Sequence, residues 1–187
     1  MQTDSEEYNM QVLRKNKSMT GRLPEGQSEE NMRQDEIIIR AMEIEDYDQV
    51  RSLWMTIRGF GIRSIDDSRE EIARFLKRNP TTSVVAEKDG RVIGAILCGS
   101  DGRQGYFYHV CVAKALRRRG IGRDMVIYCM NALRAQRINK VALIAFTKND
   151  AGNAFWRQIG WKHRQDLNYY DFVLNEENIT RFIESES

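Results

Sequence analysis

The segment of residues 110–123, VCVAKALRRRGIGR, constrains the fold more than any other part of the sequence. The apolar run at its start predicts the end of a β-strand, and the apolar residues after Gly122 recur at helical spacing, which predicts a helix. Between them lies a short turn with three consecutive arginines and two glycines. A turn that opens a helix directs several unbonded backbone N–H groups at one point, where the helix dipole adds positive potential. We therefore predict an anion pocket in this turn, and phosphate is the anion that such a turn favours.

The size and charge of the chain limit what it can do. Its 187 residues are enough for one domain with a proper core plus an appendage. The 29 basic and 27 acidic residues nearly cancel, so we expect no general attraction to nucleic acid or to an anionic membrane. No apolar run reaches the length of a membrane span, and the N-terminal residues lack the apolar core of a signal peptide.

The cysteines and histidines indicate the compartment and argue against a metal. Cys98, Cys111 and Cys129 lie in apolar contexts without CxxC spacing, so we expect reduced core residues of a cytoplasmic protein. The two histidines are far apart in the sequence, and we therefore expect no zinc or other metal site.

Two regions differ in pattern. Residues 1–35 are polar and have no sustained periodicity, which predicts a disordered N-terminal extension. Residues 36–187 carry the apolar patterns of a folded domain. Before the basic turn these patterns predict a strand at 36–40, a helix at 44–57, and strands at 83–87, 92–98 and 106–112. They also predict a second helix, for which Asp66, Asp67 and Ser68 offer caps and which stops before Pro80.

The elements that follow the basic turn complete the predicted fold. We expect a helix after Gly122, a strand at 140–146, a helix at 149–159 and a closing pair of strands at 161–163 and 169–174. The Asp-Gly pair at 89–90 predicts a hairpin between two of the earlier strands. This order predicts an α/β (α+β) fold with a mixed, mostly antiparallel central sheet and helices on both faces, and it lacks the strict βα alternation of a dinucleotide-binding domain.

Two linked motifs narrow the choice of phosphate ligand. The turn lacks the Walker string, and Met125 stands where the Rossmann fingerprint needs its third glycine. It instead reads R-x-x-G-x-G, five residues after a strand valine, with Arg117 as the first residue. Downstream, Asn149 is followed by Phe-Trp six and seven residues later and then by Ile-Gly-Trp. Together these motifs resemble the GNAT superfamily of acetyl-CoA-dependent N-acetyltransferases, and the resemblance covers residues 37–174.

The resemblance implies a site for acetyl-CoA. Backbone amides of the turn would hold the pyrophosphate, the end of the preceding strand would pair with the pantetheine amides, and Asn149 would bond the coenzyme arm. Two alternatives stay open: the arginines of the turn can form a solvated basic face, and Asn149 can act only as a helix N-cap. The residues that would bind the coenzyme are Val110, Val112, Ala113, Lys114, Arg117, Arg118, Arg119, Gly120, Ile121, Gly122, Asn149 and Trp156.

The resemblance also implies direct acetyl transfer to an amine in a ternary complex, and it leaves the proton transfers open. The tyrosine that serves many family members as general acid is replaced by Trp156, whose indole has no useful acidity, so Tyr169 or Tyr170 or no residue at all would take that role. The family places its base at positions that correspond to Tyr106 and Tyr108, which are our candidate catalytic residues. Strand alternation places His109 on the opposite face from them.

The acceptor is expected to be a primary amine of a small molecule, peptide or protein. Asp101 and Arg103, in the turn before the strand at 106–112, could recognise a charged acceptor, or they could be ordinary hairpin residues. A catalytically silent acyl-CoA-binding module is the main alternative function, and nucleic-acid binding through the arginines is a weaker one. We expect a monomer or a homodimer that binds neither nucleic acid nor membrane.

Overall fold

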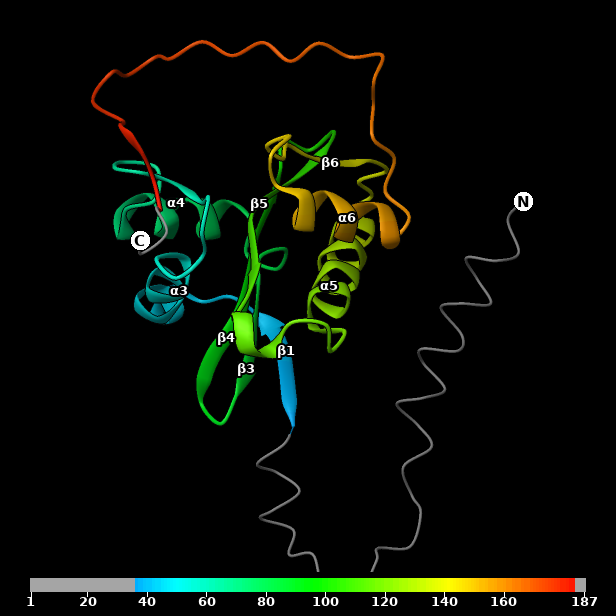
Figure 1. Ribbon diagram of the computed structural model, residues 1–187. Helices are drawn as coiled ribbons and strands as arrows, with labels where there is room; N and C mark the ends of the chain where they lie inside the picture. The colour runs from blue at the N-terminus through cyan, green and yellow to red at the C-terminus, as the bar shows by residue number, and fades with distance from the viewer. Residues whose placement is uncertain (1–35, 184–187) are drawn as a thin grey trace, which may run out of the picture. The chain divides into compact units, whose positions relative to one another are not determined.

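The computed structural model describes residues 36–183, and the predicted N-terminal extension at 1–35 lies outside this range. A five-stranded sheet in the order β1-β3-β4-β5-β6 forms its centre, as Figure 1 shows. The strands β1 (Ile37–Ala41), β3 (Val84–Lys88), β4 (Arg91–Ser100) and β5 (Gly105–Val112) are antiparallel, and β6 (Val141–Leu143) is parallel to β5. The mixed, mostly antiparallel sheet predicted from the sequence is therefore confirmed.

The hairpin between β3 and β4 forms where the sequence places it. Asp89 and Gly90 have φ values of 52° and 72°, the two left-handed positions of a type I′ turn, whose twist matches that of the strands. This turn pairs Lys88 with Arg91, and the register shifts by one residue between Ala86 and Glu87. Buried residues such as Val85 and Ala95 then lie opposite each other in the ladder.

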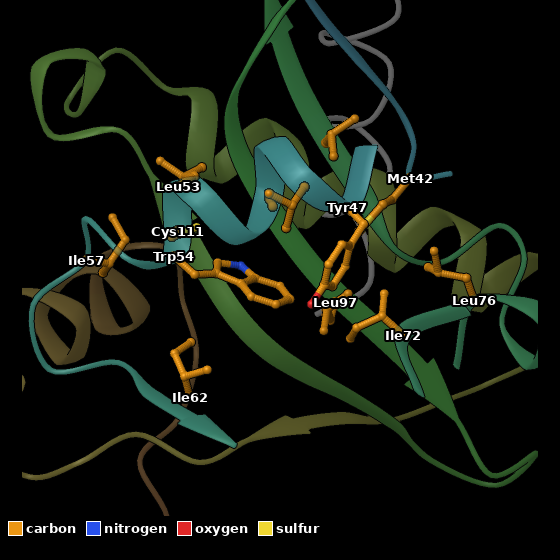
Figure 2. Packing of buried hydrophobic residues seen from close by; sticks show 13 residues of the cluster. Met42, Tyr47, Leu53, Trp54, Ile57, Ile62, Ile72, Leu76, Leu97 and Cys111 are labelled. Carbon is orange, nitrogen blue, oxygen red and sulfur yellow. The ribbon is translucent and has the colours of Figure 1, made fainter. Parts of the chain in front are cut away.

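One face of the sheet is covered by the helices α3 (Tyr47–Trp54) and α4 (Arg69–Arg78), and a short 3-10 helix, η1 (Ile44–Asp46), precedes α3. Their apolar side chains pack with those of the sheet into a core that surrounds Trp54, which is fully buried (Figure 2). The predicted cap of α4 is present, because the Ser68 side chain accepts a hydrogen bond from the backbone N–H of Glu71 at 3.3 Å.

The opposite face is covered by α5 (Ile121–Ala135) and α6 (Asp150–Gln158), as Figure 1 shows. Met125, Cys129 and Leu133 of α5 recur at helical spacing and are buried against this face. Helices on both faces of the sheet are thus confirmed. No helix of residues 36–183 is long and apolar enough to cross a membrane.

The strand β5 contains an irregularity that no pattern in the sequence predicts. Its register against β4 shifts between the pairs Ala95↔Cys111 and Leu97↔Tyr108, so that β5 holds one more residue than β4 in this interval. His109 lies there with a φ of 48°, in the left-handed region. Because the extra residue interrupts the alternation, the predicted position of His109 on the face opposite to Tyr108 is wrong, and its ring packs against Trp54 at 4.6 Å between centroids.

The strands β5 and β6 are hydrogen-bonded to each other over only a short part of β5. They pair through Gly105, Tyr106 and Phe107, and among the described residues no ladder continues on this side of β5. The strand predicted at 140–146 is correspondingly short in the structure, and Ile144 and Phe146 are exposed beyond its end. The free edge of β5 therefore begins at Tyr108.

The closing strands predicted at 161–163 and 169–174 are wrong. These residues follow α6 as an extended, mostly exposed segment that contains no strand and crosses from the side of α6 to that of α4 (Figure 1). Aromatic and β-branched residues favour a strand only where a partner and a face to pack on are present. Residues 161–174 pair with no described strand, and all of them except Trp161 are exposed. The chain instead closes with β7 (Thr180–Phe182), which pairs antiparallel with β2 (Gly61–Arg63).

Candidate functional site

The basic turn begins directly after β5. A short 3-10 helix, η2 (Lys114–Leu116), leads into it, and α5 begins at Ile121 after Gly120 as N-cap. Gly120 has a φ of 87°, which L residues with a side chain rarely adopt. Among the residues that the structure describes, a Cβ at Gly120 would have one neighbour within 4 Å, the Asp124 carboxylate at 3.8 Å, so these residues leave the space in front of Gly120 open.

The amides of the turn are available for an anion. Among the described residues, the N–H groups of Arg119, Gly120 and Ile121 have no carbonyl partner, as expected at the start of a helix. The side chain of Ile121 is buried in the core, so this residue can offer only its amide. The dipole of α5 adds positive potential at the same place. These are the properties predicted for a phosphate site.

The arginines of the turn differ in their roles. The Nε of Arg117 donates to the carbonyl oxygen of Val112 at 2.9 Å, which fastens the turn to the end of β5. Arg118 has a φ of 66°, and both Arg118 and Arg119 are exposed. Their contact with a phosphate stays a prediction, and so does the alternative of a solvated basic face.

The side chains at the end of β5 pack inward. Val110 and Val112 lie against the core below α5. Ala113 donates its N–H to Ile93 and accepts from Leu116, so both of its backbone groups are bonded within the protein. Lys114 opens η2 and is exposed. The backbone of β5 before Ala113 therefore offers the better edge for a coenzyme.

Gly122 lies where the first turn of α5 meets α6 and β5. A Cβ at this position would lie 3.4 Å from the Phe155 ring and 3.7 Å from Val112, which are ordinary contact distances. Packing within the protein therefore does not require a glycine at this position. The predicted role of Gly122, to let the diphosphate approach the backbone closely, stays a prediction.

Asn149 is the N-cap of α6. Its side-chain oxygen accepts a hydrogen bond from the N–H of Gly152 at 3.0 Å, so the capping role considered in the sequence is confirmed. The carboxamide nitrogen of the same side chain is not used in this bond, and contact with the coenzyme arm stays a prediction. Both roles are compatible with one side chain.

Trp156 belongs to a cluster of aromatic rings below the sheet. Its ring centroid lies 4.8 Å from that of Trp161, 5.0 Å from that of Phe155 and 6.2 Å from that of Phe107. Trp156 is half-buried and packs against the core formed with α5. These contacts explain a large side chain at this position without a role in proton transfer.

The two candidate tyrosines of β5 lie side by side. The rings of Tyr106 and Tyr108 are stacked with centroids 6.2 Å apart, and the edge of Phe75 from α4 meets Tyr108. Burial raises the pKa of Tyr108, and the neighbouring Tyr106 raises it further, with a smaller contribution from Tyr169. A phenol with a raised pKa is less often ionised at neutral pH and so less available as a base, and Tyr108 is therefore better suited to line an acceptor pocket.

Asp101 and Arg103 form a local turn. The Asp101 carboxylate accepts from the N–H groups of Gln104 and Arg103 at 2.7 and 2.8 Å, and these bonds lower the pKa of Asp101. This geometry is that of an ordinary hairpin residue. Recognition of a charged acceptor by either residue stays a prediction.

A second group of polar residues was missed in the sequence. The Nε2 of His109 lies 2.7 Å from a carboxylate oxygen of Asp67, and both side chains are largely buried, with 17% and 5% exposed. The sequence predicted Asp67 as a helix cap, and only the irregularity in β5 brings His109 to it. No pattern in the sequence links these residues, because they are 42 positions apart.

Among residues 36–183, no group of three or more His, Cys, Asp or Glu side chains could hold a metal ion. A surface hollow of ≈ 370 Å³ lies at the far end of α5, lined by residues such as Leu133, Ile138 and Val141. It is remote in the chain from the basic turn and from β5's free edge, and none of the candidate residues lines it.

The sequence profile of the Acetyltransferase (GNAT) family matches residues 47–161, which include α3, the three central strands, the basic turn and α6. The chain belongs to the GNAT acetyltransferase family. This membership agrees with the fold, in which a free edge of β5 leads into a glycine turn and the start of α5.

Solved structures share the fold of this GNAT protein. Ard1 from Thermoplasma volcanium has a TM-score of 0.57 and 21% identity, with 66% of this chain and 81% of that chain covered. The aminoglycoside acetyltransferase AAC(6')-Iy, solved with a bisubstrate analogue of coenzyme A and acetylneamine, has a TM-score of 0.57 and 15% identity, covering 74% and 99%. A ribosomal-protein-alanine N-acetyltransferase from Brucella melitensis biovar Abortus 2308 has a TM-score of 0.55 and 16% identity, covering 74% and 100%. At these identities the comparison establishes the common fold.

Proposed function

We propose that this protein transfers the acetyl group of acetyl-CoA to a primary amine of a small molecule, peptide or protein. The observation that carries the proposal is the unbonded edge of β5, which leads directly into the open Gly120 turn at the start of α5. An extended ligand with amides in its arm and phosphates at one end matches this pair of features. Acetyl-CoA has that construction.

The residues present fit the coenzyme. The turn amides and the dipole of α5 would hold the diphosphate, and the absence of a Cβ at Gly120 would let it approach the backbone. The Asp124 carboxylate beside the turn opposes an anion, and burial raises the pKa of this carboxyl. The arginines of the turn would offset that charge.

Direct transfer in a ternary complex is supported by the state of the thiols. Cys98, Cys111 and Cys129 are all buried and free. Burial raises the pKa of Cys111 to about 12 and also raises that of Cys129, so that neither is a thiolate at neutral pH. Neither Cys111 nor Cys129 is therefore a suitable nucleophile for an acetyl-cysteine intermediate, and Cys98 is buried away from solvent. The amine would instead attack the thioester itself. We further propose a cytoplasmic location, where such thiols stay reduced.

The acceptor would bind on the side of the sheet that carries α3 and α4. Tyr106 and Tyr108 present two stacked rings there, and Phe75 of α4 meets the ring of Tyr108. The solved neighbours include enzymes named for an aminoglycoside and for a ribosomal-protein alanine, so both amine classes belong in a first panel.

The proposal is tested by incubating the full chain with acetyl-CoA and a panel containing sisomicin, a peptide with N-terminal alanine and a lysine-containing peptide. Free thiol would be followed with a disulfide reagent, and acetylated product would be identified by mass. We expect thiol release that depends on one amine class and equals the product formed. Thiol release at the level of a buffer control with every amine would overturn the proposal.

A catalytically silent acyl-CoA-binding module is a second candidate. It is favoured by Trp156, which fills the position of the family's usual acid with a packing side chain. This candidate predicts that acetyl-CoA raises the melting temperature without any turnover. Turnover with any amine of the panel would exclude it.

A further inference from the structure

We propose that His109, held by Asp67, is the base that takes the proton from the acceptor amine. This inference rests on the proposed acetyl transfer and assigns one of its steps. The candidates taken from the sequence for this step were the two tyrosines of β5, and burial raises the pKa of Tyr108. An imidazole titrates near neutral pH and is better suited to the task.

The irregularity in β5 places His109 on the acceptor side of the sheet. Its ring lies 4.6 Å from that of Trp54 on α3 and 5.5 Å from that of Phe60 in the loop after α3. Tyr108 also faces this side, since it meets Phe75 of α4. Two consecutive residues of one strand thus face the same side, which a regular strand forbids.

The backbone at His109 is an outlier that the surroundings maintain. A φ of 48° is uncommon for a residue with a side chain and costs about 1 kcal/mol or more. Such conformations cluster where a side chain has a task, because otherwise asparagine or glycine would be easier to accommodate. The ring contacts with Trp54 and Phe60 and the bond to Asp67 hold the conformation in place.

The Asp67 carboxylate is itself fixed from several directions. One of its oxygens accepts from the backbone N–H of Arg63 at 2.7 Å, and the other faces His109 at the same distance. The hydroxyl of Tyr47 donates to the backbone carbonyl of Asp67 at 2.8 Å. With only 5% of its side chain exposed, Asp67 has little freedom to turn away.

This arrangement selects one tautomer of the imidazole. An ionised carboxylate only accepts hydrogen bonds. In a neutral His109 the Nε2 atom therefore carries the hydrogen and donates a hydrogen bond to Asp67. The lone pair then lies on Nδ1, which no described residue engages. The His109 side chain keeps 17% exposure against 5% for Asp67, so the histidine is the more accessible member of the pair.

The position of the pair along β5 agrees with the proposed coenzyme path. The free edge of β5 begins at Tyr108 and runs to Val112 before the turn. Three steps of strand from Val112 back to His109 span about 10 Å at about 3.3 Å per residue. A coenzyme with its diphosphate at the turn and its arm along this edge would carry its thioester toward His109.

Each proton and electron pair in the proposed transfer has a defined destination. The acceptor arrives as an ammonium ion, and Nδ1 of His109 takes one proton, which leaves a lone pair on the amine nitrogen. That nitrogen forms a C–N bond with the thioester carbon, the C–S bond breaks, and its electron pair leaves with the sulfur. The second proton of the new amide nitrogen passes to the thiolate, and the imidazolium returns the first proton to solvent. Asp67 touches no reacting atom, so it is a positioning residue.

Few charged groups face the imidazole. Asp67 is the carboxylate in contact with it, and the guanidinium of Arg63 is engaged with Asp66 at 3.0 Å. Tyr108 is the neighbouring phenol on the same strand. A pH dependence of the activity that is lost when His109 is replaced would therefore report on the imidazole itself.

The test compares variants of the full chain. His109→Gln keeps an N–H near the position of Nε2 but has no base, and His109→Asn suits the left-handed backbone. His163→Gln changes the other histidine, which is exposed in the segment after α6, and is the matched control. Coenzyme A affinity by calorimetry and the melting temperature are measured for each variant alongside turnover of the most active amine of the panel.

We expect both His109 variants to lose about 10²-fold or more in kcat, to lose the ascending limb of the pH profile and to keep their coenzyme A affinity. His163→Gln should match the unaltered protein. Asp67→Asn should also lower kcat, since its amide can donate to Nε2 and thereby move the imidazole proton to Nδ1. Nitrogen NMR of the imidazole would detect this exchange of tautomers directly.

The outcomes separate the two proposals. If the unaltered protein acetylates an amine and a folded His109→Gln or His109→Asn variant retains its rate and pH profile, the histidine is a packing residue and the inference is overturned. If NMR shows the neutral proton on Nδ1 of the unaltered protein, the proposed orientation is wrong. If the unaltered protein acetylates no amine, the proposed function fails and the base has no reaction to serve.

Discussion

Gly120 is the residue on which coenzyme binding is expected to depend most strongly. Its φ of 87° favours glycine, and the space in front of it is open except for the Asp124 carboxylate. Any side chain there meets the incoming ligand, and an acidic one also repels phosphate.

Gly120→Asp is therefore expected to weaken coenzyme A binding at least tenfold by calorimetry. Gly102→Asp is the matched control, because Gly102 has a φ of 90° and no atom within 4 Å of a Cβ but lies in the turn before β5. Both variants carry the backbone cost of about 1 kcal/mol, which a melting curve would report. Equal coenzyme affinity in the two variants would place the phosphate site elsewhere.

Asn149 allows its two proposed roles to be separated. Aspartate caps a helix as well as asparagine does, so Asn149→Asp should keep the cap and leave the melting temperature near its original value. The added negative charge should weaken coenzyme A binding if the side chain faces the coenzyme arm. Asn149→Ala should lose about 1 kcal/mol of stability with the cap. Unchanged coenzyme affinity in both variants would leave Asn149 with the capping role alone.

At the scale of the elements, the local signals in the sequence were sufficient for most of the fold. The Asp-Gly turn set the β3–β4 hairpin, Ser68 capped α4, and Gly120 preceded α5, because each depends on residues within a few positions. The irregularity in β5 depends on pairing with β4, and β7 depends on a partner that is more than a hundred residues away. Neither has a local cause that a sequence pattern could display.

The residues of the proposed coenzyme site could be recognised in the sequence for the same reason, whereas the proposed base could not. The basic turn is one short run of residues, and so is the segment that begins at Asn149, so each is visible in the sequence as a motif. His109 and Asp67 meet only after β5 pairs irregularly with β4 and the loop before α4 folds onto the sheet. Alternation along β5 predicted the wrong face for His109 because it assumes a regular ladder.

A network of charged side chains joins β1 to β3 and to the segment that leads into α3. Arg40 on β1 contacts Asp46 at 2.7 Å and Glu87 on β3 at 2.8 Å, and Asp46 also accepts from the N–H of Glu43 at 2.9 Å. Burial alone would raise the pKa of Asp46, but the Arg40 guanidinium and the Glu43 amide together lower it below its usual value. The folded protein therefore binds a proton at Asp46 less readily than the unfolded chain does.

This difference gives a pH prediction with a defined sign. The stabilisation by Asp46 is fully present above about pH 4, the ordinary range of the carboxyl, and is lost as the pH falls through the lowered pKa. Asp46→Asn should be less stable than the original protein by about 1–3 kcal/mol at pH 7, and the gap should narrow below pH 3.5 in urea titrations. Asp48→Asn, which alters an exposed ion pair with Arg69, should show a gap below about 1 kcal/mol. A gap for Asp46→Asn that does not change with pH would contradict this account.

Across the whole molecule, the C-terminal strand fastens the loop that precedes α4. Besides the β2–β7 ladder, the side chain of Asn178 accepts from the N–H groups of Ile65 and Asp66 at 3.0 and 3.2 Å. The hydroxyl of Ser64 donates to Glu177 at 2.9 Å. These bonds hold the backbone next to Asp67, so they support the proposed base from a distance.

Asn178→Ala should loosen this loop without unfolding the core. Loss of the bonds is worth about 1 kcal/mol, so the amides of Ile65 and Asp66 should exchange with deuterium roughly fivefold faster. Asn175→Ala is the matched control, because within residues 36–183 the Asn175 side chain accepts only from the N–H of Glu177, inside its own turn. If both variants exchange alike at Ile65 and Asp66, the C-terminal residues do not restrain the loop.

The β2–β7 pairing also has a consequence for how the protein is made. A ribosome adds about 5–20 residues per second, so roughly 6–24 s separate the synthesis of β2 (Gly61–Arg63) from that of β7 (Thr180–Phe182). During that interval the sheet, α5 and the coenzyme turn can already fold, while the loop beside Asp67 still lacks its partner. The nascent chain would thus complete the proposed coenzyme site before the loop that positions the proposed base, and the proposed acetyl transfer could not begin until β7 has been made.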